Sequence, residues 1–503
     1  MLARATARRL AAATTLGGAS VYAANDTDTG AIRFSRTLAY GALAGIDYKR
    51  ASLHPPKSDE RAAAMTLAHE RSANRLLHVC RLHGGLYNKL GQFVSSMTHL
   101  LPEPYTRVLA ACQDRAPTVA FADIRALVEI ELGAPLDRHF VEFETEPVAA
   151  ASLAQVHRAK TADGERVAVK VQYPALAKQV VSDTRAVRCV AWLLARAFPD
   201  YGYEWLLPEF EESISQELDF EREARNAART AALFASEPQV HVPFVVGALS
   251  TRRVLTMEYI DGARLDDAPA LATLGLRPAE VARLLSTAFT ELILTHGFVH
   301  CDPHPGNLLA RPMPGSTSRA QLVVLDHGMY RSLGAGFRRD YCGLWTALLT
   351  RDHHAGRAAA AALGVPAAEY DNLSLLLTFR TATSTAAAGA RMSAGERARV
   401  RERLKATTAA DVNAFLERLP RDLLFVMRAW ALVRSLNRSL GGTSRQRFLI
   451  IGDAAARGTA ADAGVLGWRR RWRRLRVQLY LRVWEAVAAL MTRHLPHTRA
   501  NLG

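Results

Sequence analysis

Two short segments near the middle of the chain carry side chains suited to phosphate chemistry. Residues 300–307 read HCDPHPGN, so the carboxylate of Asp302 precedes the amide of Asn307 by five positions. Residues 322–328 read LVVLDHG, so Asp326 follows an apolar, strand-like run. Phosphoryl transfer needs a carboxylate that orients or deprotonates the acceptor, and oxygen ligands for the magnesium that bridges the nucleotide phosphates. This spacing predicts that Asp302 acts on the acceptor and that Asn307 and Asp326 bind the metal.

Further upstream, a lysine and a glutamate supply the remaining charged groups. The alternating run RVAVKV reads as a strand and places Lys170 where protein kinases contact the nucleotide phosphates. We expect Glu223, on a later charged helix, to pair with Lys170. The run LTMEYIDG reads as the hinge, where backbone groups of Glu258 and Tyr259 would bind the adenine edge. The predicted ligand is therefore ATP with Mg²⁺.

Each of these motifs has a simpler explanation when taken alone. Lys170 could be a surface lysine at the end of a strand, Asp326 could be a turn former, and His300 with His304 could bind a metal. Several of these motifs occur by chance in the order found in kinases much less often than one motif occurs by chance alone. The order of the motifs therefore favours a kinase-like active site.

Three further motifs resemble the UbiB (AarF) family of atypical kinases. Residues 89–92, KLGQ, are similar to its Lys-x-Gly-Gln signature, and residues 217–219, ELD, to its Glu-x-Asp signature. Residues 149–152, AAAS, resemble the alanine-rich loop that replaces the glycine-rich loop of ordinary kinases. The likeness runs from about Leu86 to about Tyr330, and Asp-His-Gly at 326–328 resembles a mitochondrial AarF-domain-containing subgroup.

The resemblance implies roles for residues that the general kinase pattern leaves out. The family-specific residues are Lys89, Gly91, Gln92, Glu217 and Asp219, and the nucleotide loop is Ala149, Ala150, Ala151 and Ser152. In the family, the Lys-x-Gly-Gln helix covers the place where a protein substrate would lie, so Lys89 and Gln92 would face the active site with Glu217 as a partner for Lys89. Because alanine restricts the backbone more than glycine, we expect this loop to hold the nucleotide differently.

The expected activity is that of a Mg-ATP-dependent atypical kinase or ATPase. The resemblance implies a small or lipid-like acceptor, or a role in mitochondrial lipid or quinone homeostasis and membrane organisation. Two alternatives remain open: an ATP-binding pseudokinase scaffold without turnover, and a protein serine/threonine kinase. Turnover is the property that separates the first alternative from an enzyme.

The elements that must position these residues follow the order of a kinase. Strands are predicted at 140–143, 156–159, 166–171, 240–246 and 253–259, after a helical pattern over 61–100 and before a mainly helical remainder. This order predicts an α+β fold with two protein-kinase-like lobes, an N-terminal helical extension and extra C-terminal helices. The predicted divisions are a presequence at 1–25, a linker at 26–60, the helical extension at 61–135, the N-lobe at 136–262, the C-lobe with its helical region at 263–460, and a basic amphipathic helix at 461–503.

The beginning of the chain has the composition of an organellar targeting sequence. It contains Arg4, Arg8 and Arg9 among alanines, serines and threonines, with no acidic residue before Asp26. A mitochondrial destination is favoured over a plastid, and an ordinary basic helix is the simpler alternative. The apolar stretch 10–24 is shorter than the roughly 20 residues that a spanning helix needs. At most it predicts a weak membrane anchor.

The charge and the cysteine content indicate which classes of binding partner and which cellular compartment to expect. The chain of 503 residues has a net charge of +16, which favours phosphate-rich partners. Near its end, WRRRWRRLR suits an interfacial helix on an anionic membrane, although a solvated arginine face would read the same way. No nucleic acid is expected, because no binding module accompanies the charge. The five cysteines are scattered, which predicts a reducing compartment and no structural zinc.

Overall fold

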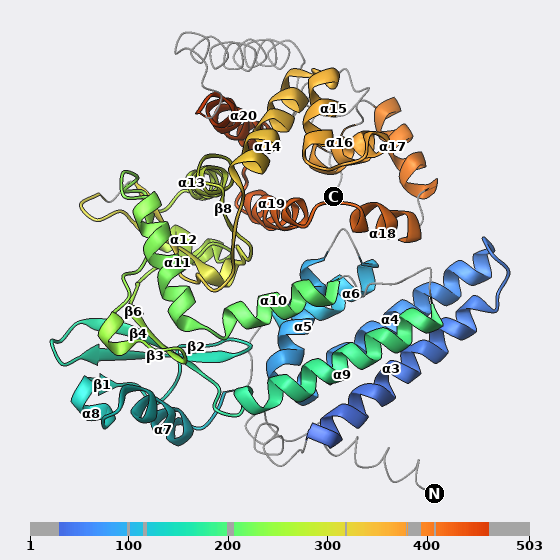
Figure 1. Cartoon of the computed structure of the whole chain (residues 1–503). Helices are drawn as coiled ribbons and strands as arrows, with labels where there is room; N and C mark the ends of the chain where they lie inside the picture. Colours follow the sequence, from blue (N-terminus) through green and yellow to red (C-terminus); the bar gives the residue numbers. More distant parts are fainter. Residues whose placement is uncertain are drawn as a thin grey trace, which may run out of the picture.

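The computed structural model describes residues 30–97, 101–113, 118–198, 206–316, 319–378, 380, 394–406 and 409–461. The predicted presequence 1–25 and residues 462–503 of the predicted basic helix lie outside this part of the chain. Figure 1 shows a sheet-containing lobe, a helical lobe and a layer of long helices beside them. The predicted two-lobed, kinase-like α+β fold with extra helices is thereby confirmed.

The layer of long helices is formed by segments that come before and after the first strands in the sequence. Its members are α3 (Gly30–Ser52), α4 (Asp59–His83), α5 (Gly85–Ser96), α6 (Glu103–Leu109) and α9 (Leu176–Ala197). The helical pattern predicted over 61–100 is divided at Gly84 and Gly85, whose φ angles of 61° and 48° favour glycine. The break turns α5 away from α4, so the Lys-x-Gly-Gln segment lies on a helix of its own (Figure 1).

The linker predicted over 26–60 is wrong for most of its length, because Gly30–Ser52 forms α3. Its glycines serve close helix packing rather than turns. A Cβ built on Gly41 would lie 2.8 Å from Val190 on α9. A buried ion pair fixes the same contact, with Arg33 Nη2 2.5 Å from Asp183 Oδ2. Partners about 150 residues away in the sequence therefore stabilise a helix that reads locally as irregular.

The N-lobe sheet has the strand order β1-β3-β4-β6, with the short β2 paired to β3. Its strands are β1 (Phe140–Phe143), β2 (Ala149–Ala150), β3 (Ala154–Thr161), β4 (Arg166–Gln172) and β6 (Val254–Glu258). All these pairings are antiparallel, and Gly164, with φ of 82°, provides the turn between β3 and β4. Helix α7 (Phe121–Leu132) covers one face, where Ile124 and Val128 pack on the valines of β4.

The strand predicted over 240–246 is shorter than expected. Only Val240 and His241 form a strand, β5, which pairs in parallel with β10 (Ala320–Val324). Pro243 explains the difference, because proline has no amide hydrogen for a sheet ladder. Beyond it, Val245 makes an isolated bridge to Met257. The segment thus links the two lobes instead of adding a full strand to the first sheet.

The second lobe is mainly helical and holds the largest apolar core. Four further helices precede α13 (Pro278–Thr290) in the sequence, and the first of them directly precedes β1. They are α8 (Leu136–His139), α10 (Leu207–Glu217), α11 (Phe220–Leu233) and α12 (Ala268–Thr273). Its short strands are β7 (Ala263–Arg264), β8 (Phe298–His300), β9 (Leu308–Pro312), β10 and β11 (Tyr330–Ser332). The later helices of this lobe are α13 (Pro278–Thr290), α14 (Ala335–Thr350), α15 (His353–Ala362), α16 (Tyr370–Thr378), α17 (Ala394–Ala406), α18 (Ala409–Glu417), α19 (Arg421–Ser439) and α20 (Ser444–Ala461). In the described ranges, no helix combines the length and the apolar character needed to cross a membrane.

Candidate active site

Lys170 lies at the centre of a three-residue charge cluster between the two lobes. On β4 its neighbours Val169 and Val171 are buried in the core, so Lys170 projects from the other face of the strand. Its Nζ lies 2.8 and 3.0 Å from the two carboxylate oxygens of Glu223, and 2.9 Å from Oδ2 of Asp326. The structure therefore brings together three of the predicted residues, which come from β4, α11 and the segment after β10.

The three charged groups of this cluster shift one another's pKa values. Burial lowers the pKa of Lys170, but Asp326 and Glu223 raise it by more, so the ammonium group stays charged. Burial raises the pKa of Glu223 to about 7, against the opposing effect of Lys170. Burial also disfavours ionised Asp326, yet Lys170 and the Gly328 amide hold its pKa well below the usual range. Asp326 is therefore a carboxylate at neutral pH, as a metal ligand must be.

Asp302 is flanked by two cations from elements far apart in the sequence. Lys89 Nζ on α5 lies 3.7 Å from Oδ2, and Arg428 Nη2 on α19 lies 3.7 Å from Oδ1. Burial raises the pKa of Asp302, but Lys89 and then Arg428 outweigh this effect and lower it. Asp302 is consequently ionised and suited to orienting a hydroxyl group or a water molecule.

His300 joins the two acidic segments instead of binding a metal. Its Nδ1 accepts a hydrogen bond from the Asp302 amide at 3.1 Å, which leaves Nε2 to donate to the Asp326 carbonyl at 2.9 Å. His304 is also engaged, because Nδ1 accepts from the Gly306 amide and Nε2 lies 3.1 Å from Gln113 Oε1. All four ring nitrogens have protein partners, so the paired-histidine metal site is not formed.

Two hydrogen bonds tie Asn307 to the segments that carry Asp302 and Asp326. Its Nδ2 donates to the Asp302 carbonyl at 3.2 Å, and its own carbonyl accepts from the Leu325 amide at 2.9 Å. These bonds hold Asn307 beside Asp326 and leave its Oδ1 outside the hydrogen bonds of the described chain. One carboxylate and one amide oxygen suit Mg²⁺, which usually shares its remaining ligands with water and nucleotide phosphates. The residues present therefore fit the predicted metal.

Arg428 is a residue that the motif analysis missed. Its side chain is 8% exposed, and its guanidinium lies 5.2 Å from the ring centroid of Phe93 on α5. Its Nε and Nη1 have no hydrogen-bond partner among the described residues. The guanidinium thus lies between the Lys-x-Gly-Gln helix and the catalytic loop. No motif marks it, because α19 is arginine-rich and only the folded chain shows which arginine reaches Asp302.

We expect Arg428→Met to shift the acidic limb of the pH profile of kcat/KM upward, because Arg428 lowers the pKa of Asp302. Arg428→Lys should restore most of the shift, since it retains the charge. The matched control is Arg421→Met, which removes a more exposed arginine of the same helix, 3.2 Å from Glu209. A profile that is equally unchanged in Arg428→Met and in the control would exclude this electrostatic role.

Lys89 contacts the charged residues of the active site, whereas Gln92 bonds to the backbone of the segment that follows α6. Lys89 Nζ lies 2.5 Å from Glu217 Oε1. Gln92 instead donates to the Cys112 carbonyl at 3.0 Å, next to the Gln113 that contacts the catalytic loop. The hydrogen bond of Gln92 is therefore made with residues 110–113 and not with a charged residue of the site, and its expected place facing the active site stays a prediction. Gly91 is needed for packing, because a Cβ there would lie 2.4 Å from the sulfur of Cys112.

The two acidic residues of the Glu-x-Asp motif have different positions. Glu217 ends α10 and bonds Lys89, while Asp219 caps α11 by accepting from the Arg222 amide at 3.0 Å. Asp219 thus stabilises the first turn of the helix that carries Glu223. The motif joins Lys89 on one side to the cluster of Lys170 on the other.

The alanine-rich loop forms a tight connection between β2 and β3. Ala149 and Ala150 pair with β3, and the Ala151 amide donates to the Ala154 carbonyl at 2.8 Å. Ser152 within the turn is 5% exposed. The Tyr173 hydroxyl donates to the Ala151 carbonyl at 3.0 Å. Such a loop is more constrained than a glycine-rich one, in keeping with the expected difference in nucleotide binding.

The predicted hinge residues use their amide groups within the protein. The Glu258 amide donates to the Phe244 carbonyl at 2.9 Å, and the Tyr259 amide donates to the Arg166 carbonyl at 3.1 Å. An adenine edge would therefore meet the carbonyl groups of this segment or the amide of the following residue, Ile260. Of the backbone groups of Glu258 and Tyr259 expected to bind adenine, the two amides are thus already bonded within the protein, and the carbonyl groups keep that role as a prediction.

His327 is held neutral beside the metal-binding carboxylate. Its Nε2 donates to the Val324 carbonyl at 3.0 Å, and its Nδ1 accepts from the Tyr330 hydroxyl at 3.0 Å. Burial and the nearby His300 lower the pKa of His327 to about 3. Protonation would cost the hydrogen bond from Tyr330, because Nδ1 could no longer accept it.

We expect His327→Phe to lower the free energy of unfolding at pH 8 by about 1–3 kcal/mol, because Val324 and Tyr330 lose their partner. The difference from wild type should shrink by about 2 kcal/mol at pH 5. In the wild type, the His327 imidazole of the unfolded chain binds a proton below a pKa of about 6.5, whereas the imidazole of the folded chain stays neutral. The stability of the wild type therefore falls as the pH is lowered from 8 to 5. Urea unfolding at both pH values, with the exposed His54→Phe as control, measures the effect. An equal difference at both pH values would contradict it.

Comparison with known proteins places this site in a family. A model of the ABC1 atypical kinase-like domain matches residues 111–359. AarF domain-containing protein kinase 1 of Xenopus tropicalis is 35% identical over 82% of this chain and 79% of its own length. Probable serine/threonine-protein kinase abkD of Dictyostelium discoideum is 35% identical over 86% of this chain, which spans only 62% of that relative. A solved Mycobacterium tuberculosis protein in complex with erythromycin matches with a TM-score of 0.48 and 23% identity, over 76% of this chain and 95% of its own. On the strength of the similarity to the curated relatives, the chain belongs to the ABC1 (UbiB/AarF) family of atypical kinases.

Proposed function

We propose that this protein transfers the γ-phosphoryl group of Mg-ATP to a small or lipid-like acceptor, or to water, beside an anionic membrane. The observation that carries the proposal is the position of α5 over the catalytic loop. Lys89 on this helix is nearly buried and lies within 3.7 Å of Asp302, so the helix occupies the approach to the catalytic carboxylate. A large polypeptide has less room there than a small hydroxyl compound.

The roles of the residues follow from their positions. Lys170, fixed by Glu223, would bind the nucleotide phosphates. Asn307 and Asp326 would hold magnesium, which neutralises the charge of the phosphates when bound. Asp302 would orient the attacking hydroxyl group or water, with its charge maintained by Lys89 and Arg428.

The test is phosphate transfer and release by the full-length protein with ATP labelled at the γ-phosphate. Phosphatidylcholine vesicles, with or without cardiolipin, supply the membrane, and purified mitochondrial proteins supply a polypeptide acceptor. We expect phosphate release, or a labelled lipid, that increases with cardiolipin. ATP binding without release or labelling under any condition would overturn the proposal in favour of a pseudokinase scaffold.

A second candidate function is transfer to protein serine or threonine. The printed names of the Dictyostelium and Xenopus relatives, which describe protein kinases, favour it. In the same experiment, label on a polypeptide that depends on Asp326 would support this candidate. The absence of labelled protein alongside rapid phosphate release would exclude it for the proteins tested.

A mitochondrial location is also part of the proposal and rests on Arg4, Arg8 and Arg9. A fluorescent fusion of the full chain should enter mitochondria, and replacement of the three arginines by glutamine should prevent import. An unchanged location in the triple variant would remove this support.

A further inference from the structure

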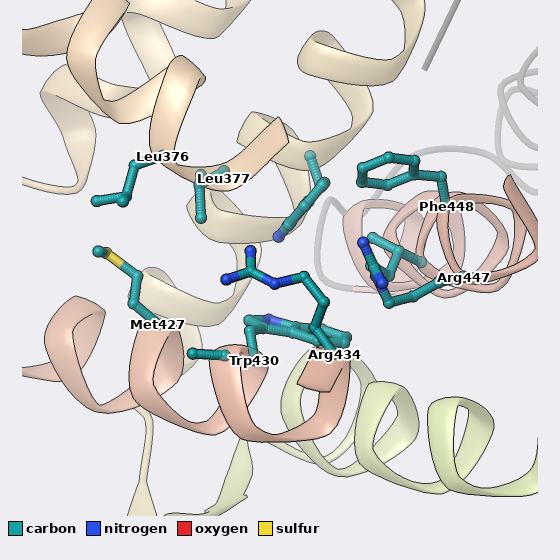
Figure 2. Close-up of a pocket in the computed structure, with 10 residues that line it drawn as sticks. Leu376, Leu377, Met427, Trp430, Arg434, Arg447 and Phe448 are labelled. Carbon is teal, nitrogen blue, oxygen red and sulfur yellow. The ribbon is translucent and has the colours of Figure 1, made fainter. Parts of the chain in front are cut away.

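A pocket in the second lobe lies apart from the charge cluster of Lys170. It is enclosed by α14, α16, α19 and α20, and comprises about 420 Å³ of empty space, part of it open to solvent. None of the predicted catalytic or nucleotide-binding residues lines it. Figure 2 shows the guanidinium groups of Arg434 and Arg447 directed into the space between these helices.

We propose that this pocket binds a small amphipathic anion, with one carboxylate or phosphate group and an apolar body. Positive charge is the first reason. Arg434 and Arg447 line the pocket, and no aspartate or glutamate does. Arg447 is only 6% exposed and joins no ion pair with the described part of the chain. A buried guanidinium without an anion is costly, and its planar donors match carboxylate and phosphate oxygens.

The surroundings of the two arginines strengthen this charge imbalance. Burial and, to a smaller extent, the nearby Arg438 together lower the pKa of Arg447 to about 10. Burial likewise lowers the pKa of Arg434 to about 10, with Arg447 and Arg438 acting in the same direction. The described charged groups that shift the pKa values of this pair are thus positive. An anion placed between them would relieve the repulsion.

The remaining walls supply apolar surface. They consist of Trp345 from α14, Leu376 and Leu377 from α16, Met427, Trp430 and Ala431 from α19, and Phe448 and Ile451 from α20. Figure 2 places Leu376, Leu377 and Met427 on one side of Arg434 and Phe448 near Arg447. A ligand that is charged at one end and apolar at the other would satisfy both parts of the lining. Because part of this space is open solvent, the pocket is too small to enclose a whole phospholipid and could cover only part of a short chain or ring system.

The experiment uses the full-length protein and isothermal titration calorimetry. The probe is decyl phosphate below its critical micelle concentration, compared with decyltrimethylammonium, decanol and inorganic phosphate. We expect saturable binding of decyl phosphate, with at least about tenfold weaker binding of the other three compounds. Equal binding of the cationic or neutral compound would overturn the proposal, because it would show apolar association without recognition of charge. Equally tight binding of inorganic phosphate would also overturn it, because the apolar walls would then contribute nothing.

Variants then locate the binding. Arg447→Met should weaken decyl phosphate binding at least about tenfold, whereas Arg438→Met, an exposed arginine that does not line the pocket, should change it less than about twofold. Without ligand, Arg447→Met should fold at least as stably as wild type, because it removes a buried charge that no carboxylate balances. If it fails to fold, the half-buried Arg434→Met provides the same test. Unchanged binding in the folded variant would overturn the proposal.

Discussion

Replacing Asp326 by asparagine should remove the magnesium-dependent part of ATP binding and reduce turnover about a thousandfold or more. The carboxylate is the charged member of the predicted metal site, and a neutral amide cannot replace its charge. The fold should be retained, because Lys170 keeps Glu223 at 2.8 and 3.0 Å. Titration of ATP with and without magnesium measures the first effect, and phosphate release measures the second.

The control for this substitution is Asp261→Asn. Asp261 is 65% exposed and pairs with Arg166 at 2.6 Å, so its loss removes a carboxylate of the same type outside the charge cluster. ATP affinity in the control should retain its dependence on magnesium. If Asp326→Asn retains the same dependence, the metal is not held at Asp326.

Asp302→Asn should lower kcat by about 10²–10⁴ while leaving the affinity for Mg-ATP within about twofold of wild type. The expected separation of kcat from affinity has a structural cause. Asp302 contacts Lys89 and Arg428, whereas Lys170 and Asp326 form the predicted phosphate and metal contacts. Single-turnover rates and nucleotide titrations test the two quantities independently. Unchanged turnover in Asp302→Asn would remove this residue from the mechanism.

The control for Asp302 is Asp163→Asn in the exposed turn between β3 and β4, which should leave both quantities unchanged. A second comparison uses Lys89→Met. Lys89 contributes most to lowering the pKa of Asp302, so this variant should lose activity first at acidic pH. Loss of activity at all pH values together with loss of ATP affinity would indicate a wider disruption of the site.

The central part of the site could be predicted because its chemistry is encoded within short segments. Asn307 follows Asp302 by five positions, and Asp326 lies two positions after the end of a strand, so local spacing largely determines where these side chains lie. The alternation of β4 likewise determines that Lys170 faces away from Val169. In such cases the local pattern and the folded structure give the same answer.

The parts that could not be predicted depend on contacts distant in the sequence. Helix α3 reads as a linker because its glycines look like turn residues until Val190 of α9 packs against Gly41. Arg428 reaches Asp302 from a helix in which several arginines look equivalent. Gln92 lies one turn from Lys89 on α5, yet a small rotation about the helix axis directs it to the Cys112 carbonyl. In each case the partner, not the local sequence, determines the role.

The most direct test of the account is the steady-state rate of phosphate release from saturating Mg-ATP. It would be measured for the full-length wild type, Asp326→Asn and Asp302→Asn, each with cardiolipin-containing vesicles. The account predicts turnover in the wild type and a loss of at least about a hundredfold in both variants. Magnesium-dependent ATP binding should be retained in the wild type and in Asp302→Asn and lost in Asp326→Asn. Equal rates in all three proteins, or no release by a wild type that binds ATP and labels no acceptor, would contradict it.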